Sequence, residues 1–273
     1  MYAGGYIGIA LHFLLQMIPG KETAMFKEVE DAWTHDSDGY DDSIQKQLKN
    51  KRDVAYWSRE LASAIGEGPK KILEVGCGPG FLSIMMSRLG YEVKAIDGAE
   101  GMIRHAARNF EAQGVAATAV LEDAVELPEE ENETYDIIIS RDVIWTLYDP
   151  EKAFRRWKDV LKPGGKVIYY DGNYRRDDDS LKTTLWKNFS TFLTVLEERK
   201  LPEKKQHHDS SSVFGELPLV RTERPDADRE LLKAAGFQRV RIARDTYRNS
   251  VTRSEFWKYG YQGKKFRVIA HKG

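Results

Sequence analysis

The stretch ILEVGCGPGF, at residues 72–81, decides how the rest of the chain is interpreted. A short apolar run ends in glycines at positions 76, 78 and 80, and a second apolar run begins at position 81. Glycines between a strand and a helix let a ligand or a neighbouring segment approach the backbone closely. The pattern leaves four alternatives: a dinucleotide, a nucleoside triphosphate, another nucleoside cofactor, or no ligand at all.

Two of these ligands do not fit the spacing. The dinucleotide fingerprint G-x-G-x-x-G would need a glycine where the chain has Phe81. A phosphate-binding loop of the form G-x-x-x-x-G-K-[ST] would need a lysine at a position where the chain has none. The glycine loop alone is a weak signal, so the segments around it have to decide.

Patterns typical of strands and helices alternate from the glycine loop onward. We expect strands at 71–76, 91–97, 116–123, 135–141 and 166–171, two more at 237–244 and 265–272, and helices at 81–90, 101–114 and 149–165. This alternation predicts an α/β fold with a doubly wound, mostly parallel sheet and helices on both faces. Ligands of such sheets bind beyond the carboxyl ends of the strands, so the residues after each strand are the candidates for a site.

Two helical regions complete the expected fold. Residues 26–66 predict helices before the first strand, and the helix at 101–114 should turn Ile103, Ala107 and Phe110 inward. Residues 175–228 form a long insert between the fifth and sixth strands. The amphipathic helix in this insert carries Leu185, Phe189, Phe192 and Leu196 on one face. Three roles are open for that helix: it packs on the domain, it covers the substrate as a lid, or it forms the interface of a homodimer. The sequence pattern does not distinguish between them.

The N-terminal segment is interpreted separately. Residues 1–24 form an apolar tail whose run at 6–18 is too short to span a bilayer, and its flanks do not resemble those of a signal peptide. We interpret the tail as accessory, or as the product of a start codon upstream of a true start at Met25. The alternative is a peripheral membrane or partner helix. Residues 25–273 then form a single domain.

Charge and cysteine content exclude several classes of protein. Among 273 residues, Lys and Arg number 42 and Asp and Glu 43, so the net charge is -1. This balance predicts no bulk attraction to nucleic acid or an anionic membrane, although a local patch can still exist. Cys77 is the single cysteine, so the chain has neither an internal disulfide nor a cysteine-based zinc site. We expect a cytoplasmic protein without a metal.

Two carboxylates strengthen the signal of the glycine loop. Asp97 ends the second strand, where a carboxylate can accept hydrogen bonds from both hydroxyls of a ribose. Asp123 ends the third strand, where a carboxylate can accept a hydrogen bond from the exocyclic amine of an adenine. Either residue alone can simply begin a turn. Together with the glycine loop they favour a cofactor that contains adenosine.

Taken in order, these segments resemble the class I S-adenosylmethionine-dependent methyltransferases, in the small-molecule branch called methyltransferase-11/25. The resemblance rests on ILEVGCGPG, VKAIDGAEGMI, LEDAVELP, YDIIISRDVIWTLYDPEKAFRRW and VLKPGGKVIYYD, and it covers about residues 68–172. It implies a seven-stranded Rossmann-like sheet with the last strand antiparallel, N-terminal cap helices, and a helical insert between strands 5 and 6. It also implies S-adenosyl-L-methionine as the cofactor.

The resemblance further implies roles for individual residues. Glu74 would help to hold the amino group of the cofactor, Asp97 its ribose hydroxyls and Asp123 its adenine amine. The other positions expected at the cofactor are Gly76, Gly78, Gly80, Gly98, Met102, Ala124 and Arg141, with Tyr40 closing the site.

Methyl transfer from a sulfonium is an in-line displacement, so a protein mainly aligns the reactants and excludes water. The candidates on the acceptor side are Asp142, Asn173 and Tyr174, which follow the fourth and fifth strands. An N-P-P-Y tetrad, typical of adenine or amide methylation, is absent after the fourth strand, and one cysteine disfavours arsenite as the acceptor. We expect a small-molecule acceptor with an O, N, S or C nucleophile that the sequence does not identify.

Two other functions stay open. Some enzymes of this fold attack the aminobutyrate carbon of the cofactor itself and form a cyclic amino acid such as azetidine-2-carboxylate. The chain could also be a non-catalytic module that binds the cofactor or regulates a partner. The glycine loop and Asp97 argue against lost cofactor binding, but not against lost catalysis.

Overall fold

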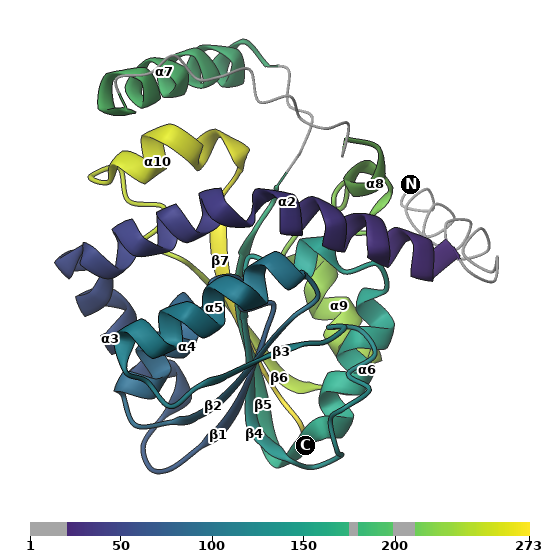
Figure 1. Cartoon of the computed structure of the whole chain (residues 1–273). Coiled ribbons are helices and arrows are strands. Elements are labelled where there is room, and N and C mark those ends of the chain that lie inside the picture. The colour runs from purple at the N-terminus through teal and green to yellow at the C-terminus, as the bar shows by residue number, and fades with distance from the viewer. Residues whose placement is uncertain (1–20, 175–179, 199–210) are drawn as a thin grey trace, which may run out of the picture.

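The computed structural model of the chain describes residues 21–174, 180–198 and 211–273. Its centre is a seven-stranded sheet in the order β3-β2-β1-β4-β5-β7-β6 (Figure 1). The strands are β1 Lys71–Val75, β2 Glu92–Asp97, β3 Thr118–Leu121, β4 Tyr135–Arg141, β5 Leu161–Gly172, β6 Gln238–Arg244 and β7 Lys265–His271. From β3 across to β5 the neighbours pair in parallel, and β7 runs antiparallel to both β5 and β6. The predicted α/β fold with an antiparallel last strand is confirmed.

Helices cover both faces of the sheet, as the alternating pattern predicts (Figure 1). One layer contains α3 (Lys51–Ile65), α4 (Phe81–Arg88) and α5 (Glu100–Gln113), and the other contains α6 (Pro150–Val160) and α9 (Asp226–Ala234). Each layer closes its own apolar core, one around Trp57 and Phe81 and the other around Phe154 and Trp157. The shorter helices are η1 Ile144–Thr146, α8 Ser211–Glu216, α10 Ser254–Tyr259 and η2 Gly260–Gln262.

The N-terminal helical region consists of two helices with different positions. The side-chain oxygen of Asn50 accepts hydrogen bonds from the first backbone N–H groups of α3, which separates α3 from the preceding α2 (Lys21–Lys49). α3 buries the apolar face that includes Trp57 and Leu61 against the sheet. α2 instead runs across the carboxyl ends of the strands (Figure 1), where it covers the ligand edge.

α5 buries a different face from the one expected. Ala107, which the pattern placed inward, is exposed, whereas the polar His105 and Asn109 are buried. The reason is that α2 packs on α5: His105 Nε2 lies 2.8 Å from Asp38 Oδ1, and Asn109 Nδ2 donates to Asp41 Oδ1 at 2.7 Å. The helix is therefore covered on two sides, which a single apolar stripe does not reveal.

The insert between β5 and β6 contains the expected amphipathic helix, α7 (Leu181–Glu198). α7 packs on α10 and η2, and none of its described side chains lines the cavity at the carboxyl edge. From the described part of the insert, α8 approaches that cavity, because the ring of Phe214 packs against Trp33 and Trp145. None of the helices in the described ranges is long and apolar enough to cross a membrane.

The connection between β6 and β7 returns to the edge that carries the glycine loop. Because β7 is antiparallel to β5, Lys265 at the start of β7 pairs with Gly172 at the end of β5. Residues 245–264 therefore lie above the carboxyl ends of the parallel strands, where ligands of such sheets bind.

Candidate active site

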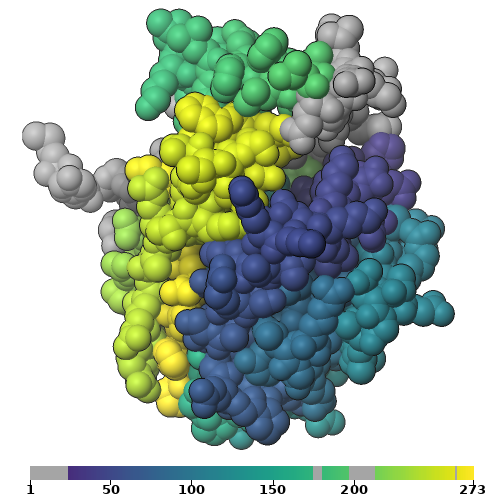
Figure 2. Space-filling view, turned by 90° about the vertical axis from the view of Figure 1, so that its left-hand side faces the viewer, coloured from purple at the N-terminus to yellow at the C-terminus, as the bar shows by residue number. Residues whose placement is uncertain are grey.

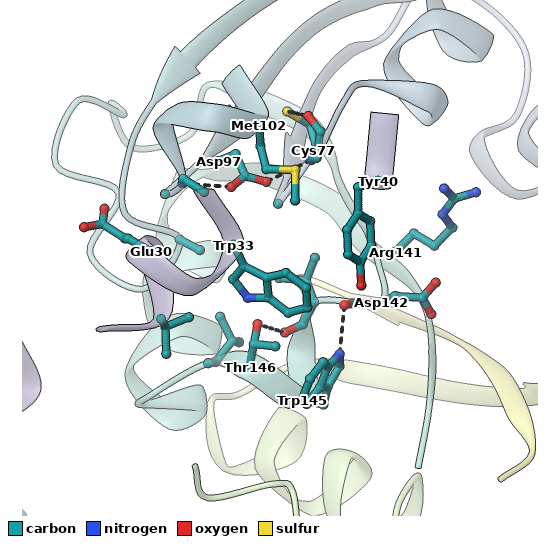
Figure 3. Close-up of a pocket in the computed structure, with 18 of the residues that line it drawn as sticks. Glu30, Trp33, Tyr40, Cys77, Asp97, Met102, Arg141, Asp142, Trp145 and Thr146 are labelled. Atoms are coloured by element: carbon teal, nitrogen blue, oxygen red, sulfur yellow. Dashed lines mark hydrogen bonds between the residues drawn. The ribbon is translucent and has the colours of Figure 1, made fainter. Parts of the chain in front are cut away.

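A cavity of about 370 Å³ lies at the carboxyl edge of the sheet, between the glycine loop and α2 (Figure 3). Its volume is within the range of small-molecule and cofactor sites. Most of the residues expected at a site from the sequence line this one cavity: Tyr40, Glu74, Gly76, Gly78, Asp97, Gly98, Met102, Asp123, Ala124, Arg141, Asp142 and Tyr174.

Two of the expected residues lie outside the lining. A Cβ atom on Gly80 would clash with the ring of Phe110, so this glycine permits the loop to pack closely on α5. Asn173 binds the backbone of Arg224 with both ends of its amide: Nδ2 donates to the carbonyl oxygen at 2.7 Å, and Oδ1 accepts from the N–H group at 2.9 Å. An amide held in this way is structural, and we do not assign Asn173 to the acceptor.

The other two glycines of the loop serve different purposes. Gly76 and Gly78 both have positive φ, 65° and 53°. A Cβ atom on Gly76 would clash with Val143, whereas a Cβ atom on Gly78 would meet no heavy atom within 4 Å. The backbone at Gly78 is therefore the part of the loop against which a ligand can lie.

Asp97 holds the glycine loop from the end of β2. Its Oδ2 accepts a hydrogen bond from the N–H of Gly78 at 2.8 Å, and its Oδ1 accepts one from the N–H of Ala99 at 2.9 Å. Burial raises the pKa of Asp97, and the two N–H groups oppose that rise. A carboxylate offers about four acceptor sites, so Asp97 can receive the hydroxyls of a ribose while it keeps the loop in place (Figure 3).

Asp123 is fixed in a similar way after β3. Its Oδ1 accepts from the N–H of Val125 at 2.7 Å, and its Oδ2 accepts from the hydroxyl of Tyr148 at 2.6 Å. The ring of Tyr148 lies 5.8 Å from the ring of Phe26 on α2. Asp123 therefore presents its carboxylate beside aromatic side chains, as a site for a purine amine would.

Glu74 and Arg141 place an acidic and a basic side chain in the cavity wall. Glu74 is buried on β1 and accepts a hydrogen bond from the hydroxyl of Ser83. Burial raises the pKa of Glu74 to about 8, against the opposing effects of the Ser83 bond and of Arg141. The guanidinium carbon of Arg141 lies 5.3 and 5.0 Å from the centres of two aromatic rings, and its Nη1 donates to Gln47 Oε1 at 3.2 Å. Buried charges need partners, so a ligand with an ammonium and a carboxylate would complement this pair.

Asp142 lines the cavity, and its backbone is held in an unusual conformation. Its φ is 62°, in the left-handed region that side chains other than glycine seldom adopt. The N–H of Asp142 donates to the carbonyl oxygen of Tyr170 at 2.8 Å, and its own carbonyl oxygen accepts from Trp145 Nε1 at 2.9 Å (Figure 3). Strain that the surroundings maintain in this way is typical of functional positions.

The carboxylate of Asp142 is surrounded by donors and positive charge. Arg248 Nη1 lies 2.8 and 3.0 Å from its two oxygens, and the hydroxyl of Tyr174 donates to Oδ1. Burial would raise the pKa of Asp142, but Arg248, Lys265 and Arg141 lower it to about 2. Asp142 is therefore ionised throughout the neutral pH range.

Arg248 and Lys265 do not line the cavity, but they contact Asp142 and Tyr174, which do, and the sequence analysis missed both. Arg248 Nε also donates to Asp245 Oδ2 at 2.7 Å, which fixes the guanidinium between two carboxylates. Lys265 Nζ lies 3.5 Å from the centre of the Tyr174 ring, and burial lowers the pKa of Lys265 to about 8. The expected topology could have indicated both residues. If the last strand is antiparallel, the connection that precedes it, residues 245–264, must lie at the edge of the sheet where ligands bind.

Helix α2 forms the roof of the cavity. The ring of Trp33 packs edge-to-face with Tyr40 at 5.3 Å and with Trp145 at 6.0 Å. Trp33 and Tyr40 both reach from α2 into the cavity (Figure 3). A Cβ atom on Gly101 would lie 2.5 Å from Ser37 Oγ, so α2 sits directly on the start of α5. The element that covers the site is therefore α2.

Comparison with known proteins points to the same region. Residues 73–169 match the methyltransferase domain family. A ubiquinone biosynthesis O-methyltransferase from Ruegeria pomeroyi is 32% identical over 127 residues, which cover 46% of this chain and 49% of that protein. The chain therefore spans about half the length of the curated relatives it matches.

Solved structures share the fold over a larger part of the chain. An S-adenosylmethionine-dependent methyltransferase from Aquifex aeolicus superposes with a TM-score of 0.53 at 17% identity, over 85% of this chain and 98% of that one. The [4+2]-cyclase SpnF superposes with a TM-score of 0.55 at 17% identity, over 80% of each chain. At these identities the similarity concerns the fold alone, and one of the two structures is named for a different reaction.

The fit to the cofactor rests on the cavity itself. Three features of the cavity suit the parts of S-adenosyl-L-methionine. They are the open face of Gly78, the carboxyl groups that follow β2 and β3, and the acidic and basic side chains of Glu74 and Arg141. The family match covers β1 to β5 up to Tyr169, which are the strands that position these groups. Residues 73–169 of this chain are therefore similar to the methyltransferase domain of class I S-adenosyl-L-methionine-dependent methyltransferases.

Proposed function

We propose that this chain transfers the methyl group of S-adenosyl-L-methionine to the oxygen of an acidic hydroxyl, such as a phenol or an enol, on a small flat acceptor. The observation that carries the proposal is the carboxylate of Asp142, which lines the cavity and stays ionised. The Ruegeria pomeroyi relative, named as an O-methyltransferase, supports oxygen as the nucleophile. The bound cofactor supplies an electrophilic methyl group on its sulfonium.

The proposal assigns the cofactor to the wall formed by the strand ends. Asp97 would receive the ribose hydroxyls and Asp123 the adenine amine. Glu74 and Arg141 would pair with the ammonium and the carboxylate of the methionine end. This arrangement is supported by the burial of both side chains, since an ionised Glu74 and the Arg141 guanidinium would each gain an oppositely charged partner from the cofactor.

The strength of the base decides the class of acceptor. A carboxylate with a pKa of about 2 accepts a hydrogen bond from a hydroxyl group, but it is far too weak a base to deprotonate an aliphatic alcohol. An acidic hydroxyl needs only to be oriented, because it releases its proton to the solvent easily as the oxygen–methyl bond forms and the sulfur–methyl bond of the cofactor breaks. Arg248 and Tyr174 keep the Asp142 carboxylate in one position, so the oxygen it binds is aligned for in-line attack.

The aromatic roof supports a flat acceptor. Trp33, Tyr40 and Trp145 surround the part of the cavity near Asp142 (Figure 3). Rings in this arrangement stabilise another ring by offset or edge-to-face contact and exclude water from the reacting atoms. The negative faces of the same rings also favour the positive charge of a sulfonium.

The test compares matched acceptors and one variant. The full chain is incubated with S-adenosyl-L-methionine and with a phenol, an aniline, a thiophenol and a benzyl alcohol of the same ring, and S-adenosylhomocysteine is measured by mass spectrometry. We expect turnover with the phenol. Asp142→Asn should lower this turnover by about a hundredfold, because the attacking oxygen is then poorly aligned, while cofactor affinity stays unchanged. Turnover with the aniline or thiophenol alone would refute oxygen as the nucleophile. Methylthioadenosine formed without any acceptor would indicate attack within the cofactor instead of transfer.

A further inference from the structure

A turn at residues 245–250, directly after β6, carries Arg248 to the carboxylate of Asp142. Nη1 of Arg248 lies 2.8 and 3.0 Å from the two oxygens of Asp142. Within the turn, the backbone N–H and Nε of Arg248 both donate to the carboxylate of Asp245, at 2.8 and 2.7 Å. Because Asp245 belongs to the same turn, these bonds fix the conformation of the Arg248 side chain but not the position of the turn relative to Asp142.

One attachment joins this turn to the start of β7. Asn249 Nδ2 donates to the carbonyl oxygen of Lys265 at 2.7 Å, and its Oδ1 accepts from the N–H of Lys265 at 2.9 Å. The N–H of Asp245 donates to the same carbonyl oxygen at 3.0 Å. These bonds tie the turn to the sheet next to it.

A second attachment is made by Tyr247, the residue immediately before Arg248, and it reaches α3. The ring of Tyr247 stacks on the ring of Tyr56, with centres 3.7 Å apart and planes 8° apart. The guanidinium carbon of Arg253 lies 3.8 Å from the centre of the Tyr247 ring, so it covers the opposite face. The hydroxyl of Tyr247 donates to Asp53 Oδ1, which also accepts from Arg253 Nη2 at 2.7 Å. Tyr247 is therefore held on both faces and at its hydroxyl.

The partners of Tyr247 belong to a helix that is itself fixed. Asp53 is buried on α3, and the same helix packs its apolar face on the sheet. Burial and the neighbouring Asp53 raise the pKa of Tyr247 to about 12, so its hydroxyl keeps the proton that it donates. In Figure 2 the yellow surface of the connection between β6 and β7 lies beside the blue surface of the N-terminal helices.

We propose that Tyr247 is a positioning residue for the acceptor, because its attachment to α3 holds Arg248 against the carboxylate of Asp142. Tyr247 itself does not line the cavity, so it acts through Arg248. A displacement of about 1 Å at a reacting group can lower a rate by about a hundredfold. The effect on turnover rests on the proposed role of Asp142 in orienting the acceptor, whereas the effect on the contact between Arg248 and Asp142 does not.

The first measurement needs no acceptor. The full chain is labelled with carbon-13 at its aspartate carboxyl groups, and the NMR resonance of Asp142 is identified by its absence from Asp142→Asn. At neutral pH we expect Tyr247→Ala to move this resonance toward its position in Arg248→Gln, and Tyr247→Phe to move it less. The matched control, Tyr91→Ala, also removes a half-buried tyrosine whose hydroxyl donates to the protein, at 2.9 Å to the carbonyl oxygen of Gly66, and should leave the resonance in place. An unmoved resonance in Tyr247→Ala, or in Tyr247→Phe should Tyr247→Ala fail to fold, would overturn the proposal.

The second measurement compares turnover of the phenol with cofactor affinity from calorimetry. Tyr247→Ala should lower kcat by about tenfold and leave cofactor affinity unchanged, because the cofactor groups lie elsewhere in the cavity. In the Arg248→Gln background the same substitution should have almost no further effect, since both act through one contact. An equal loss in both backgrounds, or a parallel fall in cofactor affinity, would show a general structural role and overturn the proposal. If Asp142→Asn leaves turnover unchanged, the proposed function fails instead, and the Asp142 resonance alone decides whether Tyr247 positions Arg248.

Discussion

Glu74 should couple cofactor binding to the release of a proton. Burial raises its pKa from 4.5 to about 8, a shift that corresponds to about 5 kcal/mol. At about pH 6.5 the carboxyl group of the empty protein is therefore almost entirely neutral. If the ammonium group of the cofactor pairs with Glu74, the ionised form becomes favoured, and binding should expel close to one proton.

Calorimetry measures this proton directly. Binding of S-adenosyl-L-methionine is titrated at about pH 6.5 in two buffers of different ionisation enthalpy, where the α-amino group of the ligand keeps its own proton. We expect release of about one proton by the unchanged chain and of almost none by Glu74→Gln, which keeps the size of the side chain. Equal heats in both buffers for the unchanged chain would refute the pairing. Proton release that persists in Glu74→Gln would place the titrating group elsewhere.

The same shift predicts how the empty protein depends on pH. In the unfolded chain Glu74 ionises near pH 4.5, whereas in the folded chain it stays neutral up to about pH 8. Its contribution to stability is therefore complete below pH 4.5 and is lost as the pH rises through about 8. Glu74→Gln cannot ionise, so its free energy of unfolding in urea should fall less between about pH 5 and pH 8.

Three further substitutions test the site. Asp97→Ala removes the acceptor proposed for the ribose and the bonds that hold the loop. Calorimetry should show at least a tenfold loss of cofactor affinity, about 1.4 kcal/mol, and unchanged affinity would contradict the assignment. Gly101→Ala places a Cβ atom 2.5 Å from Ser37 Oγ, so α2 should be displaced. We expect a lower melting temperature and weaker cofactor binding. An unchanged melting temperature would show that α2 adapts to the added methyl group. Arg248→Gln removes the main positive neighbour of Asp142, so the pKa of Asp142 should rise from about 2. In a plot of turnover rate against pH, the fall in rate on the acid side should then move to higher pH. An unchanged acid side would show that Asp142 does not cause this fall.

The strands and the glycine loop follow from local sequence. Strands β1 and β4 are continuous apolar runs bounded by turn residues, because both of their faces are covered by helices. The loop at Gly78 is marked by its glycines, and Asp97 is marked by its place after a strand. Parallel strands bring their carboxyl ends to one edge, so residues far apart in sequence could be assigned to one site before any contact was known.

Contacts between distant segments decided what the sequence left open. Asn173 and Tyr174 both follow β5, yet the amide of Asn173 binds the backbone of Arg224 and does not line the cavity. This contact forms only because the end of the insert, at Arg224, lies beside the end of β5. Arg248, more than a hundred residues away in the chain, bonds to Asp142 and helps to lower its pKa. No local pattern encodes such a pairing, because it arises only when the antiparallel last strand brings its preceding connection to the site.

The amphipathic helix of the insert shows most clearly which features the sequence determines and which features only the tertiary structure decides. Its sequence determined that Leu185, Phe189 and Phe192 share one face, because side chains recur every 3.6 residues along a helix. It could not determine which way that face points, because an apolar stripe lowers its free energy against a core, a second copy or a lipid surface alike. The tertiary structure decided this by anchoring Trp186 and Ser190 of α7 to the backbone of α10, which leaves Leu185, Phe189 and Phe192 exposed.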